Sequence, residues 1–217
     1  MTEHTIAVSR TARYYTAGAV GPHLDEVWFG CHGYGQLVQD FLSYLEPLND
    51  GNRYIVAPEA LSRFYREGVS GTVGASWMTR EFRDAEIADY VAYLDRVYER
   101  VFSEIDRSAV TFHVLGFSQG VAAACRWIAR GNSPIDHVVM WAGQLPPEFA
   151  DPGDVQELRA SRISVVWGTQ DETLSGETMR NHGERLRSLG LSFAEIVFEG
   201  GHRLDRQTLL NVSRRTR

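Results

Sequence analysis

The chain has 217 residues, of which 43% are hydrophobic and 23% are charged, proportions close to those of soluble globular proteins. This composition excludes a disordered acidic tail, a collagen and a small protein built on disulfides. The formal net charge is −6, which argues against general binding to nucleic-acid backbones, because such binding needs a basic surface. The two cysteines, Cys31 and Cys125, form no metal-ligand cluster and are expected to be buried free thiols rather than a disulfide.

No segment has the pattern of a secretory signal or a membrane span. Residues 1–13 lack an apolar stretch of signal-peptide length, and no run approaches the roughly 18 apolar residues that cross a bilayer. We therefore predict a cytoplasmic protein without integral membrane association. Because the sequence contains no repeat, low-complexity tract or linker, we expect residues 1–217 to form a single domain.

Strand and helix patterns alternate along the chain, which is typical of a mostly parallel sheet with helices on both faces. The predicted strands are 5–8 and 13–16 (an edge hairpin), 27–31, 54–57, 110–115, 137–141, 163–167 and 193–198. Apolar residues at helical spacing predict helices at about 37–45, 87–105, 119–130, 177–189 and 204–212.

Residues 59–83 interrupt this alternation. They are rich in glycine and aromatic residues and show no clean periodicity, so we predict an irregular insertion. Long loops in compact domains are often functional, and we interpret this one as an active-site insertion. An ordinary surface excursion is the alternative.

Residues 116–120 read Gly-Phe-Ser-Gln-Gly and match the G-x-S-x-G pattern of a nucleophile elbow. They follow an apolar strand and begin a helix, which is the context that an elbow requires. The two glycines let strand and helix approach closely around a strained turn. The helix N-terminus directs backbone N–H groups toward the serine. We predict Ser118 as the nucleophile, and a serine that only caps the helix is the alternative.

A serine nucleophile needs a base, and the base needs an orienting acid. In this arrangement the acid and then the histidine follow the serine along the chain. His202 comes directly after a predicted strand and two glycines, at the strand end where parallel sheets place reactive groups. His182 lies in a polar helical segment, where a solvated surface histidine is expected. We therefore predict His202 as the base.

Asp171 follows the strand predicted at 163–167, and by the same reasoning we predict it as the acid. The adjacent Glu172 is an alternative for this role. Other carboxylates fit less well, because they follow other strands less directly or lie too close to the histidine in the chain: Asp136, Asp151 and Asp205.

An oxyanion hole needs two backbone N–H donors. The amide of Gln119, directly after the nucleophile, is predicted to be one of them. The second is predicted to be the amide of Tyr34, because Gly33 and Gly35 allow the backbone to turn an amide inward. His32 precedes Ser118 and is interpreted as a structural hydrogen-bonding residue rather than a base.

Together these residues resemble the α/β-hydrolase superfamily, and within it the carboxylesterase/phospholipase family of serine esterases, which includes acyl-protein thioesterases and lysophospholipases. The resemblance covers most of the chain, from residues 32–35 to residues 201–202. It implies an α/β-hydrolase fold without a large lid domain and a triad of Ser118, His202 and Asp171. The pair Ser76-Trp77 resembles the segment that lines the acyl site in this family. We therefore predict Trp77 and Met78 as substrate-binding residues, with packing of Trp77 onto the sheet as the alternative.

Two positions depart from the family pattern. Gln36 stands where an aspartate is usual, and the acid loop reads Asp171-Glu172-Thr173-Leu174-Ser175 where Asp-x-x-Val-Pro is common. Both departures leave the predicted triad intact, but they leave the identity of the substrate open.

The sequence thus predicts a serine hydrolase that cleaves carboxylic esters through an acyl-enzyme. One alternative is an acyl thioesterase or lysophospholipase with the same triad, and another is a non-catalytic binding protein of the same fold. No phosphate loop, dinucleotide fingerprint or metal cluster occurs in the sequence, so we expect no cofactor and no metal. The expected partner is a small-molecule ester, and the expected state is a monomer or homodimer.

Overall fold

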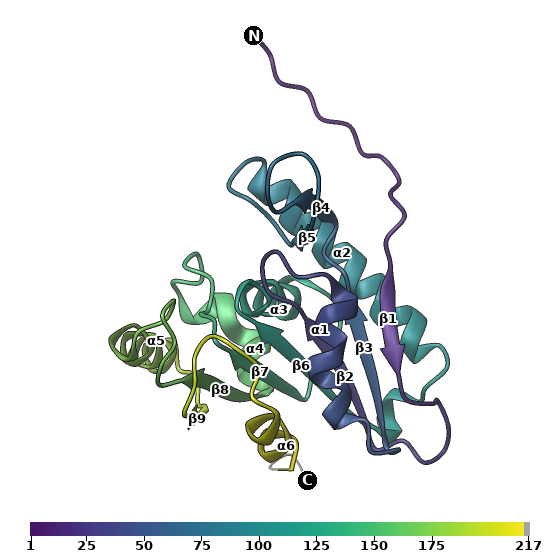
Figure 1. Ribbon diagram of the computed structural model, residues 1–217, viewed down its shortest axis with the longest axis vertical. Helices are drawn as coiled ribbons and strands as arrows, with labels where there is room; N and C mark the ends of the chain where they lie inside the picture. The colour runs from purple at the N-terminus through teal and green to yellow at the C-terminus, as the bar shows by residue number, and fades with distance from the viewer. Residues whose placement is uncertain (215–217) are drawn as a thin grey trace.

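A computed structural model describes residues 1–214 of the chain, and most of its strands form one seven-stranded sheet in the order β1-β3-β2-β6-β7-β8-β9 (Figure 1). The strands are β1 (Tyr14–Ala17), β2 (Glu26–Cys31), β3 (Arg53–Pro58), β6 (Thr111–Phe117), β7 (His137–Trp141), β8 (Arg162–Gly168) and β9 (Ala194–Phe198). The edge strand β1 is antiparallel to β3, and the other pairs are parallel. Since parallel strands end at the same edge, the loops after β2, β6, β8 and β9 meet there.

Helices cover both faces of this sheet (Figure 1). They are α1 (Val38–Leu45), α2 (Arg83–Phe102), α3 (Gln119–Arg130), α4 (Gln156–Ala160), α5 (Gly176–Ser188) and α6 (Arg206–Arg214), with short 3-10 helices at Glu46–Leu48, Arg107–Ala109 and Pro152–Val155. The apolar residues of α1 and α6 pack on one face, around Trp28 and Trp141. Those of α2 to α5 pack on the other face, in two clusters that both include residues of α3. In the part of the chain described, no helix is long and apolar enough to cross a membrane.

The predicted alternation of strands and helices is confirmed, with shifts of a few residues at element ends. Every residue of β2 is buried, as expected for a central parallel strand covered on both faces. The buried stripe of α2, from Ile87 to Val101, is the stripe that the helical spacing predicted. Cys31 and Cys125 are buried and not bridged, in agreement with the expectation of free thiols.

The strand predicted at 5–8 is wrong. Residues 1–12 contain no strand, and Ile6 and Val8 are exposed because β1 already occupies the edge of β3. Figure 1 shows this N-terminal arm extending away from the body of the molecule.

Residues 59–83 are more regular than predicted, because they contain an antiparallel hairpin of β4 (Ser62–Tyr65) and β5 (Val73–Ser76). The hairpin is attached to the loop after β2. The amide of Gly35 donates to the carbonyl of Ala75 at 2.8 Å, and Gln36 forms an isolated bridge with the same residue. The insertion therefore lies beside the edge where the parallel strands end.

Candidate active site

Ser118 lies on a strained turn between β6 and α3. Its backbone has φ 54° and ψ −118°, a conformation that is costly for a residue with a Cβ atom and that occurs preferentially at functional sites. The glycines on either side are sterically required. A Cβ at Gly116 would lie 2.5 Å from the carbonyl oxygen of Gly120, and one at Gly120 would collide with the carbonyl of Cys31. The sharp turn predicted from the G-x-S-x-G pattern is therefore present.

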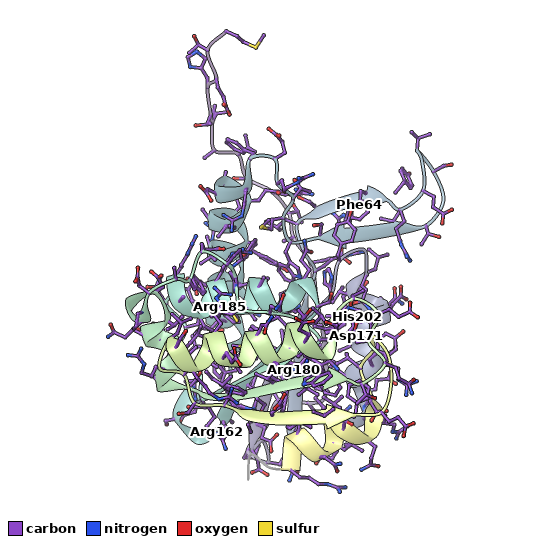
Figure 2. The ribbon with its side chains drawn as sticks, turned by 90° about the vertical axis from the view of Figure 1, so that its left-hand side faces the viewer. Phe64, Arg162, Asp171, Arg180, Arg185 and His202 are labelled. Atoms are coloured by element: carbon purple, nitrogen blue, oxygen red, sulfur yellow. The ribbon has the colours of Figure 1, made fainter. Side chains whose placement is uncertain are left out.

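Asp171 and His202 lie on neighbouring loops at the ends of β8 and β9. Backbone hydrogen bonds join the two loops, from Thr169 N to Phe198 O at 2.9 Å and from Gln170 N to Gly200 O at 2.8 Å. The side chains meet directly, with 2.7 Å between His202 Nδ1 and Asp171 Oδ2. Figure 2 shows the labelled pair side by side, with Phe64 of the hairpin farther out.

The second carboxylate oxygen of Asp171 is held by the acid loop itself. Oδ1 accepts hydrogen bonds from the Thr173 amide at 2.8 Å, the Thr173 hydroxyl at 2.6 Å and the Leu174 amide at 3.0 Å. Burial opposes the charge on Asp171, but hydrogen bonds from Thr173 and His202 outweigh it, so the pKa of this carboxyl is lowered. Glu172, the alternative acid, is exposed. Asp171 is therefore a buried carboxylate that orients the His202 ring.

His202 also lies beside the elbow. Its ring centroid is 5.0 Å from that of Phe117, the residue before Ser118. Within residues 1–214 the Ser118 hydroxyl has no hydrogen-bond partner, and contacts between a nucleophile and its base are often loose until substrate binds. The His202 side chain is 26% exposed, so the ring remains accessible from the solvent side.

The loop after β2 is shaped by His32. The His32 Nδ1–H donates to the Gly33 carbonyl at 2.8 Å, and Nε2 accepts from the Ala60 amide at 3.0 Å. The ring is fully buried, and burial lowers its pKa, so it is a neutral imidazole with both nitrogens occupied. These contacts agree with the structural role predicted for His32.

Some backbone amides of this loop donate hydrogen bonds within the described residues, and others do not. Gly33 N donates to Gln36 Oε1 at 2.8 Å, Gly35 N to Ala75 O at 2.8 Å, and Gln36 N to Gly33 O at 3.3 Å. The amide of Tyr34 has no partner in the described part of the chain. The same holds for the amide of Gln119, because the first turn of a helix leaves its N–H groups unpaired. The two amides predicted to line an oxyanion hole are thus available.

Gln36, which stands where the sequence pattern usually has an aspartate, has a local structural role. Its side chain accepts the Gly33 amide, and its own amide returns to the Gly33 carbonyl. The sequence identified Gln36 only as a departure from a pattern, whereas the structure shows that it closes the turn around Tyr34.

Trp77 is more deeply placed than a substrate-binding residue requires. It is 2% exposed, its Nε1–H donates to the His32 carbonyl at 2.8 Å, and its ring packs against His32 and Tyr90. The Gln119 side chain accepts the Trp77 amide at 3.1 Å and donates to the Met78 carbonyl at 2.9 Å. The burial of Trp77 favours the packing alternative, whereas Met78 is only partly buried.

The expectation of a solvated His182 is wrong. The ring is 2% exposed, and its Nε2 accepts the Leu145 amide at 3.0 Å. Burial, with a smaller contribution from Arg185, lowers the pKa of His182 to about 4. The polar sequence of α5 gave no indication that His182 is buried. The ring contacts the loop after β7, which is distant in the sequence. Because Nε2 of His182 is bound to the amide of that loop, the choice of His202 as the candidate base is unaffected.

The comparison with solved structures reveals extensive similarity. Over 95% of this chain and 98% of the other, the fold is similar to esterase PE8 (TM-score 0.69, 18% identity) and to Zea mays acyl-protein thioesterase 2 (TM-score 0.70, 19% identity). It is also similar to the Bacillus cereus carboxylesterase, with TM-score 0.67 and 14% identity over 94% of this chain and 92% of that one.

The amino-acid sequence itself matches no protein-family model and no curated protein. At 14–19% identity, the structural likeness establishes the fold and does not extend to the substrate. The neighbours share the mostly parallel sheet flanked by helices, and residues 1–214 contain no large additional domain. The chain has the α/β-hydrolase fold.

Proposed function

We propose that this protein is a serine hydrolase that cleaves carboxylic esters through an acyl-enzyme. One observation carries the proposal: the Asp171–His202 pair, 2.7 Å apart, lies at the same edge of the sheet as the strained Ser118. The similarity in fold to esterases and a carboxylesterase supports the same reaction class.

In the proposed reaction, Ser118 Oγ attacks the carbonyl carbon of the ester while its proton moves to His202 Nε2. Asp171 accepts the hydrogen bond from Nδ1–H, which keeps Nε2 unprotonated before the attack and stabilises the imidazolium after it. The tetrahedral intermediate collapses when the same proton passes to the leaving alcohol. Water activated by His202 then hydrolyses the acyl-enzyme and restores Ser118.

The negative oxygen of the intermediate is assigned to the amides of Tyr34 and Gln119. Both amides lack an internal partner in the described residues, so each can donate to an oxyanion without first breaking another bond. Met78, partly buried next to the Gln119 side chain, is the proposed contact for the acyl group.

Acyl thioester hydrolysis is the second candidate. The same residues would form the same acyl-enzyme, and only the leaving group would differ. The similarity in fold to Zea mays acyl-protein thioesterase 2 is the observation that favours it. In both cases we propose a small-molecule or acyl-chain substrate and action in the cytoplasm as a monomer or homodimer.

A fluorophosphonate probe tests the nucleophile. The native protein should be labelled once, at Ser118, and Ser118→Ala should lose both labelling and nearly all turnover while keeping its melting temperature, since it removes one oxygen without opening a large cavity. Ser43→Ala, which changes an exposed serine of α1, is the matched control and should behave like the native protein. Labelling at another residue, or full activity of Ser118→Ala, would show that the assignment is wrong.

The substrate class is tested separately with p-nitrophenyl esters of increasing chain length beside acyl thioesters of the same chains. A higher kcat/KM for the oxygen esters supports the first candidate, and a higher value for the thioesters supports the second. The Ser118→Ala protein provides the background for every substrate. No turnover above that background for any substrate would favour a non-catalytic binding protein.

A further inference from the structure

Thr173 lies in the acid loop, two residues after Asp171, and its side chain contacts both members of the acid–base pair. Its hydroxyl lies 2.6 Å from Asp171 Oδ1 and 2.7 Å from His202 Nδ1. The sequence indicated only that this loop departs from the family pattern, and it assigned no role to Thr173.

The hydrogen-bonding capacity of each group determines the direction of these contacts. A hydroxyl has one proton and accepts with its lone pairs, so Thr173 donates its proton to the Asp171 carboxylate and accepts from His202. In the tautomer that the proposed reaction requires, Nδ1 carries a proton. That proton is then shared between Asp171 Oδ2 and Thr173 Oγ1, both at 2.7 Å.

We propose that Thr173 is a positioning residue for the base, an inference that rests on the proposed hydrolase function. Its hydroxyl holds one oxygen of the Asp171 carboxylate and offers His202 Nδ1–H a second acceptor. When Nε2 takes the serine proton, the ring becomes positively charged and both acceptors bind it more strongly. The contribution therefore grows toward the transition state and affects kcat rather than substrate binding.

Local folding alone does not require the Thr173 hydroxyl. The amides of Thr173 and Leu174 already bind Asp171 Oδ1, and they would remain after the hydroxyl is removed. The residue is exposed, so its side chain fills no core position. A hydroxyl that serves only the turn would have no need to approach His202.

The test compares Thr173→Val, Thr173→Ser and a matched control, Thr178→Val. Valine keeps the shape of threonine without its hydroxyl, and serine restores the hydroxyl. Thr178 lies nearby at the start of α5, where its hydroxyl contacts Ser175. For Thr173→Val we expect kcat and the rate of fluorophosphonate labelling to fall about tenfold, a change typical of losing one hydrogen bond to a charged group. KM and the melting temperature should stay unchanged. Thr173→Ser should recover most of the rate, and Thr178→Val should match the native protein.

Each other result has a definite meaning. Normal kcat and labelling in Thr173→Val would overturn the role of Thr173 while leaving the proposed hydrolase intact. The role of Thr173 would also be overturned if Thr173→Ser did not restore the rate, or if Thr178→Val lost rate as well. Either result would indicate a general effect on the loop. A change in KM alone would place Thr173 in substrate binding instead. Absence of labelling at Ser118 in the native protein would contradict the proposed function, and this inference with it.

Discussion

Three histidines of this chain differ in what holds their ring nitrogens. His32 and His182 are buried, and each accepts a backbone amide through Nε2. His202 is partly exposed and is held by a carboxylate through Nδ1. Of the three, His202 therefore has the combination of an oriented ring and an accessible second nitrogen that a general base needs.

His202→Ala should lose activity on the same scale as Ser118→Ala, a factor of about a thousand or more, because residues of a triad act as a unit. For the same reason, the double variant should be no less active than either single one. Steady-state ester hydrolysis, with active-site labelling to count competent protein, measures both. If the double variant were much slower than each single variant, Ser118 and His202 would contribute independently. That result would contradict their assignment to one triad.

His182→Ala should lower stability rather than catalysis. Removing the ring leaves the buried Leu145 amide without its acceptor, a loss of about 1–3 kcal/mol in the free energy of unfolding. Urea denaturation measures this loss, and kcat/KM at a temperature well below unfolding should stay near native. A rate loss as large as that of His202→Ala, with stability unchanged, would instead place His182 in the catalytic site.

The elements around the elbow approach one another so closely that a methyl group cannot be added at Gly120. Its Cβ would meet the backbone carbonyl of Cys31 at the end of β2, and a backbone atom cannot rotate away as a side chain can. Gly120→Ala should lower the free energy of unfolding by about 1–3 kcal/mol, the usual range for overpacking, and should also disturb the turn that carries Ser118. Gly153→Ala is the control, since its Cβ would enter open space. Equal melting temperatures for the two variants would contradict this account of the elbow.

The segment after β5 links the hairpin to the elbow through Trp77. Because Trp77 packs against His32 and Tyr90 and is nearly inaccessible, Trp77→Ala should lower the free energy of unfolding by about 3–5 kcal/mol. The order of preference along a series of ester chain lengths should stay the same. Trp77→Phe keeps most of the ring volume but loses the bond to the His32 carbonyl, so it should be intermediate in stability. A reordered chain-length preference in either variant would instead support the prediction that Trp77 is a substrate-binding residue.

At the scale of the whole molecule, buried neutral histidines link stability to pH. His113 and His137 face each other across β6 and β7, with 3.1 Å between their Nδ1 atoms. Burial is the main cause that lowers the pKa of His113 to about 2 and those of His137 and His182 to about 4. Nearby arginines lower these values further, as does His137 in the case of His113.

These pKa values predict loss of stability in mild acid. Histidines of the unfolded chain have a pKa near 6.5, so below that pH the unfolded state binds protons that the folded state does not. The free energy of unfolding should therefore fall as the pH drops below about 6.5, by up to about 1.4 kcal/mol per pH unit for each of the three histidines. Urea unfolding at pH 7, 6 and 5 measures the slope at pH values where carboxylates contribute little. His182→Gln should reduce the slope, and a stability that is constant from pH 7 to pH 5 would contradict the prediction.

The sequence alone determined the sheet-and-helix alternation and the positions of the candidate site. Continuous apolar runs and helical spacing are local signals, and they predicted most elements to within a few residues. The elbow at Ser118 is also local, because its two glycines and its strand-to-helix context lie within a dozen residues. The same sequence reasoning predicts Asp171 and His202 as acid and base, since parallel strands end at one edge and each residue follows such an end.

Only the tertiary structure decided which side chains are buried and what they contact. His182 lies on a polar helix, and its environment is set by Leu145, 37 residues away. Trp77 meets His32 at a separation of 45 residues, and Thr173 reaches His202 across 29. The hairpin in residues 59–83 was missed because its two strands have only four residues each, and short strands depend on tertiary context such as the hydrogen bond from Gly35 to Ala75. Such contacts form only when the chain has folded, and periodicity along the sequence therefore does not reveal them.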